Sequence, residues 1–533
     1  MLLHRALSPG RLIVERSSAV SVEAAPPTPP PPPISGARLA RNASAMMAAQ
    51  LLTWAMAFLV AIFQPRILGP LAIGQLSIAF SIWMIASVLI TFGMDTYLTK
   101  AIAREPHRTG ALVGTSFVVR IGLWVVSCVI VLGYELLMVD VDPTQSALIW
   151  IIGLMTLFSV LSGGLIAALN GLEQVHYVSL VTVMSKLVLT VVSLSLLFAG
   201  FDVIWIGWTN VFAALVALLG DAYFLFRQHR PRWSVDLVAA RSMLLDARQY
   251  LVTALTLMVY QQIDRLFIAM FASTEAVGWY GTAVNLFGTL MFFPVAISTV
   301  IFPTFTRRFA AGQDYLAQAA RPIFNIMLAL SIPIGLGLLV LAEPITLLLY
   351  GEAFRPTGVV LAVLGLVLIC TYLNTVLSQL LIAAERTTIL NTIMLAATVA
   401  TLPLDFWLVP WTDRLFGNGA LGGALAYTIT ELGILIAAMK ALPKGTFGVQ
   451  TWRTGVLTSL AGIGMVASIW WLRLSPFFFL AVPLGALVYA GLVLALRALP
   501  SDDLALVKEV LFKVLERAPF IRRKLTAAQP EGS

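Results

Sequence analysis

The feature that most constrains this chain is a succession of apolar stretches, each long enough to cross a bilayer at about 20 residues per span. Fourteen such segments follow one another between residues 43 and 498. They are 43–64, 72–93, 111–133, 146–169, 177–199, 204–226, 246–271, 278–305, 322–349, 358–383, 387–409, 419–440, 454–473 and 477–498. Because a backbone surrounded by hydrocarbon must satisfy its own hydrogen bonds, these segments are predicted to be helices. We therefore expect an all-α polytopic membrane protein with about 14 transmembrane helices.

The composition agrees with a membrane location. The chain is 59% hydrophobic and only 11% charged, whereas soluble proteins carry about 25% charged residues. Its net charge of +8 therefore indicates basic cytoplasmic loops rather than a nucleic-acid partner. Cys128 and Cys370 lie in apolar segments and predict neither a disulfide nor a metal site, and the four histidines lack metal-ligand spacing.

The loop charges predict the orientation. With the N-terminus inside, 27 of the 34 Lys and Arg residues fall in the tails and loops of the inner face. Four fall in the outer loops, and three lie within segments. Positive residues gather on the cytoplasmic side of membrane proteins. We therefore expect a multi-pass protein of the bacterial inner membrane with both termini in the cytoplasm.

Short repeated sequences predict two related halves. Gly74 and Gly278 occupy similar positions at an offset of 204, and Leu-Ile-Ala-Ala occurs at both 165–168 and 381–384. An even repeat unit gives parallel halves related by an axis along the membrane normal. We expect two pseudo-symmetric six-helix bundles followed by two further helices.

This division predicts six parts of the chain. The run of prolines before residue 34 predicts a disordered tail, and the end of the chain predicts an amphipathic helix on the inner leaflet. The parts are a cytoplasmic Pro-rich tail (1–41), an N-terminal six-helix bundle (42–227), a basic cytoplasmic linker (228–245), a C-terminal six-helix bundle (246–441), helices 13 and 14 (442–499) and a cytoplasmic amphipathic tail (500–533).

The segment 246–271 carries an unusual set of polar residues. Gln261, Gln262, Asp264 and Arg265 lie within one turn. A polar stripe also runs along one helical face, formed by Gln249, Thr253, Thr256, Tyr260 and Asp264. Ionisable residues inside a membrane are costly and usually functional. The stripe predicts a wet cavity between helices, and a structural Asp264–Arg265 pair is the alternative.

Several short motifs occur in a characteristic order along residues 42–440. They are Ile67-Leu68-Gly69-Pro70, Thr99 to Glu105, Val277-Gly278-Trp279-Tyr280, Leu347 to Phe354 and Gly417 to Ala424. In this order they resemble the oligosaccharide and polysaccharide flippases of the multidrug/oligosaccharidyl-lipid/polysaccharide exporter superfamily. The Pro-rich N-terminus is not part of that family pattern.

The resemblance implies two bundles around a central cavity and alternating access. It further implies export of a polyprenyl-pyrophosphate-linked oligosaccharide, such as an O-antigen, capsule or exopolysaccharide unit. Its expected partners are this substrate, membrane lipids and a polysaccharide polymerase or glycosyltransferases. A lipid II-type flippase and a small-molecule or multidrug antiporter of the same superfamily are the alternatives.

Charged and amide residues deep in the segments are the candidate site. We expect Arg120, Lys186 and Arg265 to contact phosphate or acidic sugar, because cations replace the hydration of a phosphate. Gln261 and Asn374 suit the sugar. These three cations against two carboxylates give a balance of +1, which argues against a carrier of cationic drugs. In the alternative interpretation, Arg120 and Lys186 pair with carboxylates between helices.

Asp264 and Glu431 are expected to balance these cations or to bind a coupling proton or Na⁺, and no other cofactor is expected. The sequence lacks HExxH, GxxxxGK[ST] and clustered Asp motifs. We therefore expect a transporter driven by a gradient rather than an enzyme.

Overall fold

The structure is a computed structural model of the chain. It describes residues 36–137, 142–229, 234–295, 297, 313–442, 446–500 and 503. Contacts divide the chain into residues 1–47 and residues 48–533. Of the first unit only residues 36–47 are described, as the first turns of a helix, and the second unit contains all the other described residues. Most of the predicted tails, 1–35 and 504–533, lie outside the described residues.

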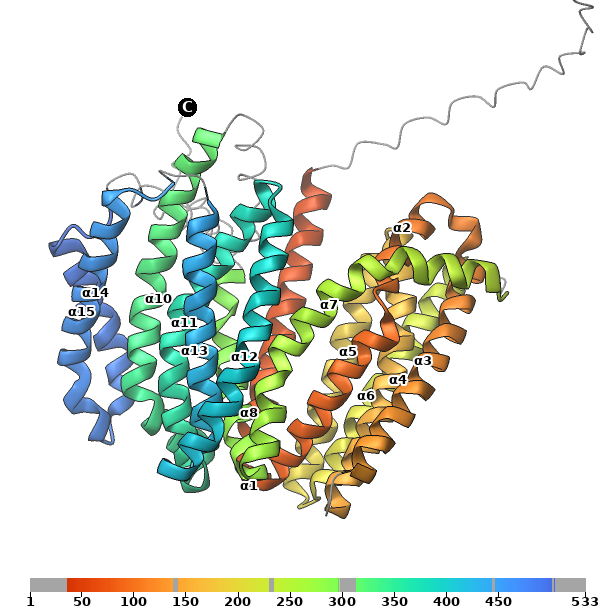
Figure 1. Cartoon of the computed structure of the whole chain (residues 1–533), viewed down its shortest axis with the longest axis horizontal. Coiled ribbons are helices and arrows are strands. Elements are labelled where there is room, and N and C mark those ends of the chain that lie inside the picture. The colour runs from red at the N-terminus through yellow and green to blue at the C-terminus, as the bar shows by residue number, and fades with distance from the viewer. Residues whose placement is uncertain are drawn as a thin grey trace, which may run out of the picture. The chain divides into compact units, whose positions relative to one another are not determined.

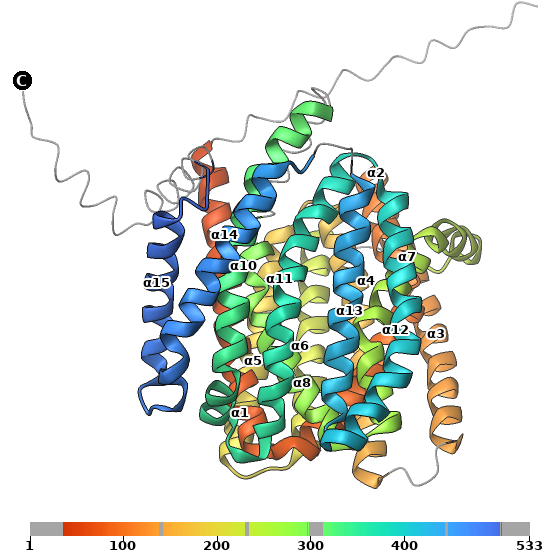
Figure 2. The same cartoon turned by 60° about the vertical axis from the view of Figure 1, so that its left-hand side comes forward.

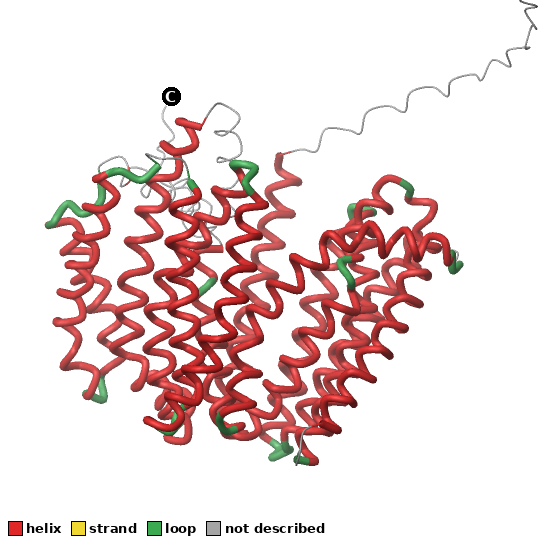
Figure 3. Tube along the Cα trace, viewed as in Figure 1, coloured by secondary structure: helices red, strands yellow, loops and turns green. Residues whose placement is uncertain are grey.

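Helices and short turns make up the described part, which contains no strand (Figure 3). This confirms the predicted all-α polytopic fold. The α-helices are α1 (Gly36–Thr91), α2 (Met94–Arg104), α3 (Thr109–Leu137), α4 (Pro143–Gly171), α5 (Val175–Phe198), α6 (Val203–His229), α7 (Leu237–Phe271), α8 (Thr274–Leu290), α10 (Gln313–Tyr350), α11 (Arg355–Ala383), α12 (Thr387–Phe416), α13 (Gly419–Ala441), α14 (Val449–Ile469) and α15 (Ala481–Ala495). Four 3₁₀ turns join them: η1 (Pro106–Arg108), η2 (Glu352–Phe354), η3 (Trp470–Leu474) and η4 (Phe478–Leu480).

Twelve helical stretches of the described chain are long and apolar enough to span a membrane. The first covers 52–104 and contains a sharp bend at Gly69, where φ is 80° and ψ is 171°. Glycine adopts this conformation without a steric cost, and Pro70 follows it directly. The stretch therefore contains most of the first predicted segment and all of the second. The predicted seventh segment lies in α7, which is helical over 35 residues but too polar to count among the twelve.

The helices differ from the predicted segments in three places. The first helix begins at Gly36 rather than after residue 41. The stretch 94–104, expected in a loop, is the helix α2, which begins after Phe92 and Gly93 with positive φ. The predicted linker 228–245 is helical from Leu237 onward. The reason lies in packing, because Met243 and Ala247 of α7 are fully buried in a cluster with the apolar face of α2.

Two groups of helices are held together mainly by contacts within each group. One contains α2 to α6, joined by the part of α1 after Gly69, where the Trp83 indole N–H donates to the Ile149 carbonyl at 2.6 Å. The other contains α7, α8 and α10 to α13. The first half of α7 also contacts α2 and α3, so α7 runs between the groups (Figure 1). Helices α14 and α15 pack on α10 at the edge of the second group (Figure 2).

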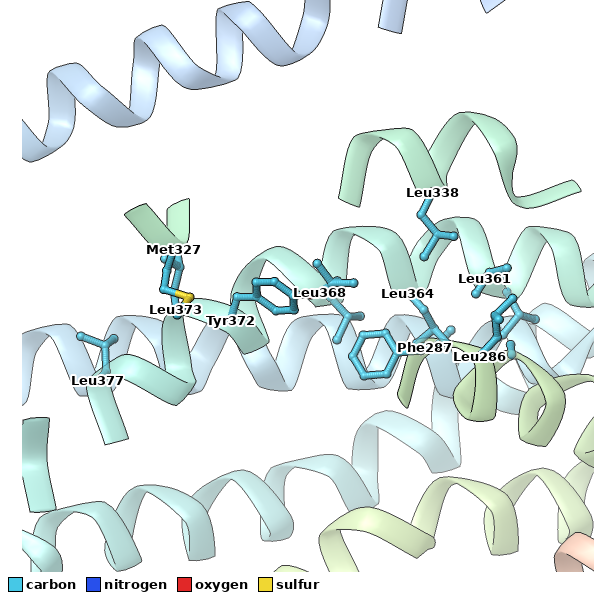
Figure 4. Close-up of a cluster of buried hydrophobic side chains, with 14 of the residues drawn as sticks. Leu286, Phe287, Met327, Leu338, Leu361, Leu364, Leu368, Tyr372, Leu373 and Leu377 are labelled. Atoms are coloured by element: carbon cyan, nitrogen blue, oxygen red, sulfur yellow. The ribbon is translucent and has the colours of Figure 1, made fainter. Parts of the chain in front are cut away.

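Helix α11 is the centre of the second group. Its side chains Leu361, Leu364, Leu368 and Tyr372 are fully buried and point toward α8 and α10 (Figure 4). The Tyr372 hydroxyl donates to the Leu290 carbonyl at 2.5 Å, which ties α11 to the last turn of α8. Since lipid is as apolar as these side chains, close packing rather than water exclusion holds such helices together.

The repeated glycines meet each other at the end of the molecule that carries Gly69. A Cβ on Gly74 of α1 would lie 1.9 Å from the Thr274 carbonyl oxygen, and one on Gly278 of α8 would lie 2.0 Å from the Pro70 carbonyl oxygen. Only glycine allows the two backbones to approach this closely. Arg66 of α1 adds a hydrogen bond of 2.9 Å to the Leu348 carbonyl of α10. We call this contact between the two groups the glycine junction.

Alanine at either junction glycine should destabilise the protein. We expect Gly74→Ala and Gly278→Ala each to lower the free energy of unfolding by about 1–3 kcal/mol, because the new methyl overlaps backbone that cannot move aside. Unfolding of the purified protein in detergent measures this. Gly433→Ala is the matched control, since a Cβ there meets no atom within 4 Å. Equal stability of all three variants would contradict this account of the junction.

Candidate functional site

Arg120 is held at the centre of the first group. Helix α3 presents its guanidinium, which is completely buried. One nitrogen donates to Asp95 Oδ1 of α2 at 2.5 Å, and another donates to the Val160 carbonyl of α4. Gly163 of α4 leaves the necessary space, since a Cβ there would lie 3.3 Å from the guanidinium. The partner is thus a carboxylate on a neighbouring helix, Asp95, as in the alternative interpretation.

Asp95 is the solvent-accessible member of this ion pair. Its side chain is 49% exposed, whereas that of Arg120 is fully buried. It lines a cavity of about 360 Å³, within the size range of small-molecule sites. The cavity walls also carry hydroxyl, amide and ammonium groups, contributed by Thr96, Thr99, Lys100 and Asn170. These groups can exchange hydrogen bonds with a hydroxylated ligand. We call this space the Asp95 cavity.

Glu431 is the centre of a polar cluster in the second group. Its carboxylate accepts hydrogen bonds from Tyr260 of α7 at 3.0 Å, Thr371 of α11 at 3.2 Å and Asn374 of α11 at 2.7 Å. The cluster is buried. Asn374, predicted to bind sugar, therefore faces Glu431 in this structure, and Tyr260 packs against α13 rather than lining open space.

A second buried cluster joins α7, α8 and α12. The Tyr280 hydroxyl donates to the Asp264 carboxylate, and Asp405 of α12 faces the same carboxyl group. Asp405 is completely buried, and among the described residues no donor group reaches either of its oxygens. Two facing carboxylates repel each other, and a proton or a cation between them would relieve this repulsion. Within the described chain, no group of three or more His, Cys, Asp or Glu side chains has the arrangement of a metal site.

The remaining predicted site residues lie apart from one another. Arg265 donates to Gln262 Oε1 at 2.6 Å, and the same oxygen accepts from Ser81 of α1 at 3.1 Å. Gln261 is exposed on α7, and Lys186 is exposed on α5. The structure thus joins Asn374 with Glu431, but it does not bring Arg120, Lys186 and Arg265 into one cationic cavity.

Two buried carboxylates do not appear in the charge balance expected from the sequence. Asp221 of α6 is buried and accepts a hydrogen bond of 2.6 Å from Ser162 of α4. Asp405 is the second, and neither belongs to a polar stripe that would draw attention to it. With these two and the half-buried Asp95, acidic groups outnumber basic ones inside the helices. The expected balance of +1 is therefore wrong, because it omits single carboxylates in apolar segments.

Comparisons with known proteins define the class. A solved structure of the lipid II flippase MurJ in an inward closed conformation matches with a TM-score of 0.69 at 15% identity, covering 86% of this chain and 99% of that chain. An inward-facing multidrug resistance MATE family transporter of the MOP superfamily matches with a TM-score of 0.56 at 15% identity. This match covers 73% of this chain and 94% of that chain. A search of curated proteins found no match. The fold is that of the MOP superfamily transporters.

Sequence profiles identify the family within that class. The family model for polysaccharide biosynthesis proteins matches residues 39–309, and the MatE model matches residues 250–407. The first match covers half of the chain. The chain belongs to the polysaccharide biosynthesis protein family, which confirms the resemblance found in its motifs.

The Asp95–Arg120 pair should be strongly coupled in stability. We expect Asp95→Ala to lower the free energy of unfolding by about 3 kcal/mol, because it leaves a buried guanidinium without its counter-charge. A double-mutant cycle with Arg120→Ala should give a coupling energy of at least about 1 kcal/mol. Chemical unfolding in detergent measures both.

A matched control is the exposed pair of Arg355 and Glu352, which lie 3.0 Å apart. Arg355→Ala should cost less than about 1 kcal/mol, since exposed pairs contribute little. Additive effects at Asp95 and Arg120 would show that the pair does not act as a unit.

Proposed function

We propose that this protein moves a polyprenyl-pyrophosphate-linked oligosaccharide across the bacterial inner membrane by alternating access, with both termini in the cytoplasm. The observation that carries the proposal is the Asp95 cavity, a polar space open beside a fully buried charge in a chain of this family. Hydroxyl and amide groups on its wall suit a sugar. Under this proposal the protein moves its substrate without making or breaking covalent bonds. A polysaccharide polymerase or glycosyltransferases are the proposed partners.

Two other substrates fit parts of the evidence. A lipid II-type flippase is supported by the match to the MurJ structure, which extends over 86% of this chain, against 73% for the MATE transporter. A small-molecule antiporter is supported by the excess of buried carboxylates, which suits cationic compounds. The match of the polysaccharide biosynthesis family to residues 39–309 favours the first proposal.

Lipid analysis of cells tests the substrate. Deletion of this chain should leave lipid-linked oligosaccharide trapped on the inner leaflet with loss of surface polysaccharide, and the wild-type chain should reverse both. Accumulation of lipid II instead would favour the second substrate. Normal surface glycan with no trapped intermediate would overturn the flippase proposal and point to efflux of a small molecule.

We further propose that Asp264, Asp405 and Glu431 bind the coupling proton or Na⁺. Facing carboxyl groups with no donor on Asp405 form a place where a cation is favourable. Helix α7 contributes Asp264 to one cluster and Tyr260 to the other. Binding of a cation at either cluster can therefore affect the position of this helix.

Neutralising Asp405 should uncouple transport. We expect Asp405→Asn, which keeps the shape and removes the charge, to lower gradient-driven transport at least about tenfold with normal insertion. Proteoliposomes with an imposed pH or Na⁺ gradient measure this. Asp202→Asn is the matched control, because Asp202 is exposed just before the start of α6. Full gradient dependence in Asp405→Asn would exclude Asp405 from coupling.

A further inference from the structure

Helix α2 has a basic face that the buried clusters do not use. Its apolar face, with Met94, Leu98 and Ile102, is completely buried. On the other side Lys100, Arg104 and Arg108 follow at spacings of four, the last from η1, and all three are exposed. Lys100 and Arg104 thus lie one turn apart on α2, which ends at Arg104, and Arg108 continues the row of basic residues in η1.

The row lines a second cavity of about 320 Å³ between α2, η1 and the first half of α7. Its walls are formed by Tyr97, Lys100, Ala101, Arg104, Glu105, Arg108, Leu112, Asp246 and Tyr250. Three cations against two carboxylates give this space a net charge of +1. We call it the basic groove.

Two of the three cations have no counter-charge among the described residues. Arg108 pairs with Glu105 at 3.1 Å. Lys100 donates instead to the neutral Tyr250 hydroxyl at 3.0 Å, with its ammonium 5.3 Å from the ring centre. Within the described chain neither Lys100 nor Arg104 has a carboxylate within ion-pair distance, so both are free to take an anionic ligand.

The basic groove adjoins the Asp95 cavity, since Lys100 lines both. One space therefore offers cations and the other offers hydroxyl, amide and carboxylate groups, with Lys100 at their boundary. An arginine fork and an ammonium are the groups that replace the hydration of a phosphate. A ligand with a phosphate joined to a sugar matches this order of groups.

We infer that the basic groove binds the diphosphate of the lipid-linked substrate, with Lys100 and Arg104 on the phosphates and the first sugar in the Asp95 cavity. The inference rests on the proposed function and adds the place at which the headgroup is held. A bulk anionic phospholipid shares the phosphate chemistry, but it does not account for the adjoining polar cavity. The buried Arg120 then acts by holding Asp95 in place rather than by touching phosphate.

Binding to the purified full chain tests the inference. The protein is placed in nanodiscs of neutral phosphatidylcholine, and a short-chain prenyl diphosphate is the probe in a thermophoresis titration. The triple variant K100A/R104A/R108A should bind at least about tenfold more weakly, the loss expected for one charge-assisted hydrogen bond or more. Asp246→Asn should bind more tightly than wild type, because it removes a negative charge from the opposite wall.

Two control variants show whether a loss of binding comes from the groove rather than from a change in total charge or in folding. R227A/K440A removes two exposed basic side chains from the last turns of α6 and α13 and should leave binding unchanged. K100R/R104K/R108K keeps all three charges and should retain most of the binding. Unfolding curves of each variant test whether the triple alanine protein is folded.

The possible outcomes distinguish an error in the binding site from an error in the proposed function. Wild-type protein that fails to bind the probe would count against both the groove and a diphosphate substrate. Wild-type binding matched by the triple variant would overturn only the groove. Displacement of the probe by phosphatidylglycerol at equal concentration would overturn the choice of substrate over bulk lipid.

Discussion

A charge inside an apolar helix is stable only when a partner replaces the water it has lost, and this requirement organises both groups of helices. Arg120 joins α2, α3 and α4 through Asp95 and the Val160 carbonyl. Glu431 joins α7, α11 and α13 in the same way. Because each cluster takes its partners from one group, either group can shift as a body while its buried charges remain satisfied.

The main backbone contact between the groups is of another kind. At the glycine junction, backbone lies on backbone and Arg66 adds a hydrogen bond to a carbonyl. Such contacts carry little penalty on separation where water can reach the freed groups, in contrast to a broken buried ion pair. Helix α7 is the continuous link, with its first half on α2 and α3 and its second half in both carboxylate clusters. A movement between the groups therefore involves α7.

The helical fold could be predicted because it depends on local properties of the sequence. Segment length and apolarity decide that a stretch is a helix, and the offset of 204 aligned two glycines that prove to be in contact. The partner of a buried charge could not be predicted in this way. The helical period shows which residues share one face of a helix, but it does not show which other helix packs against that face. Asp95 falls in a predicted loop, and so the pairing of Arg120 stays hidden in the sequence.

The same limit explains the misjudged charge balance. A polar stripe is visible in a sequence, whereas Asp221 and Asp405 are single polar residues in apolar surroundings and become notable only when burial is known. Leu237 to Leu245 likewise falls in the predicted linker, and its packing on α2 explains why it is helical. Tertiary contacts decided each of these cases.

The charged residues of the two proposed sites lie in different groups of helices. The buried carboxylates Asp264, Asp405 and Glu431 lie in the second group, whereas the unpaired cations Lys100 and Arg104 lie where α2 ends, in the first group. A diphosphate would be repelled by the buried carboxylates and held by the end of α2, and a coupling cation would show the opposite preference. Under the proposed function the two ligands thus occupy different groups and do not compete for one site. Among the described helices, α7 both lines the basic groove and carries a coupling carboxylate, so we expect their coupling to run through it.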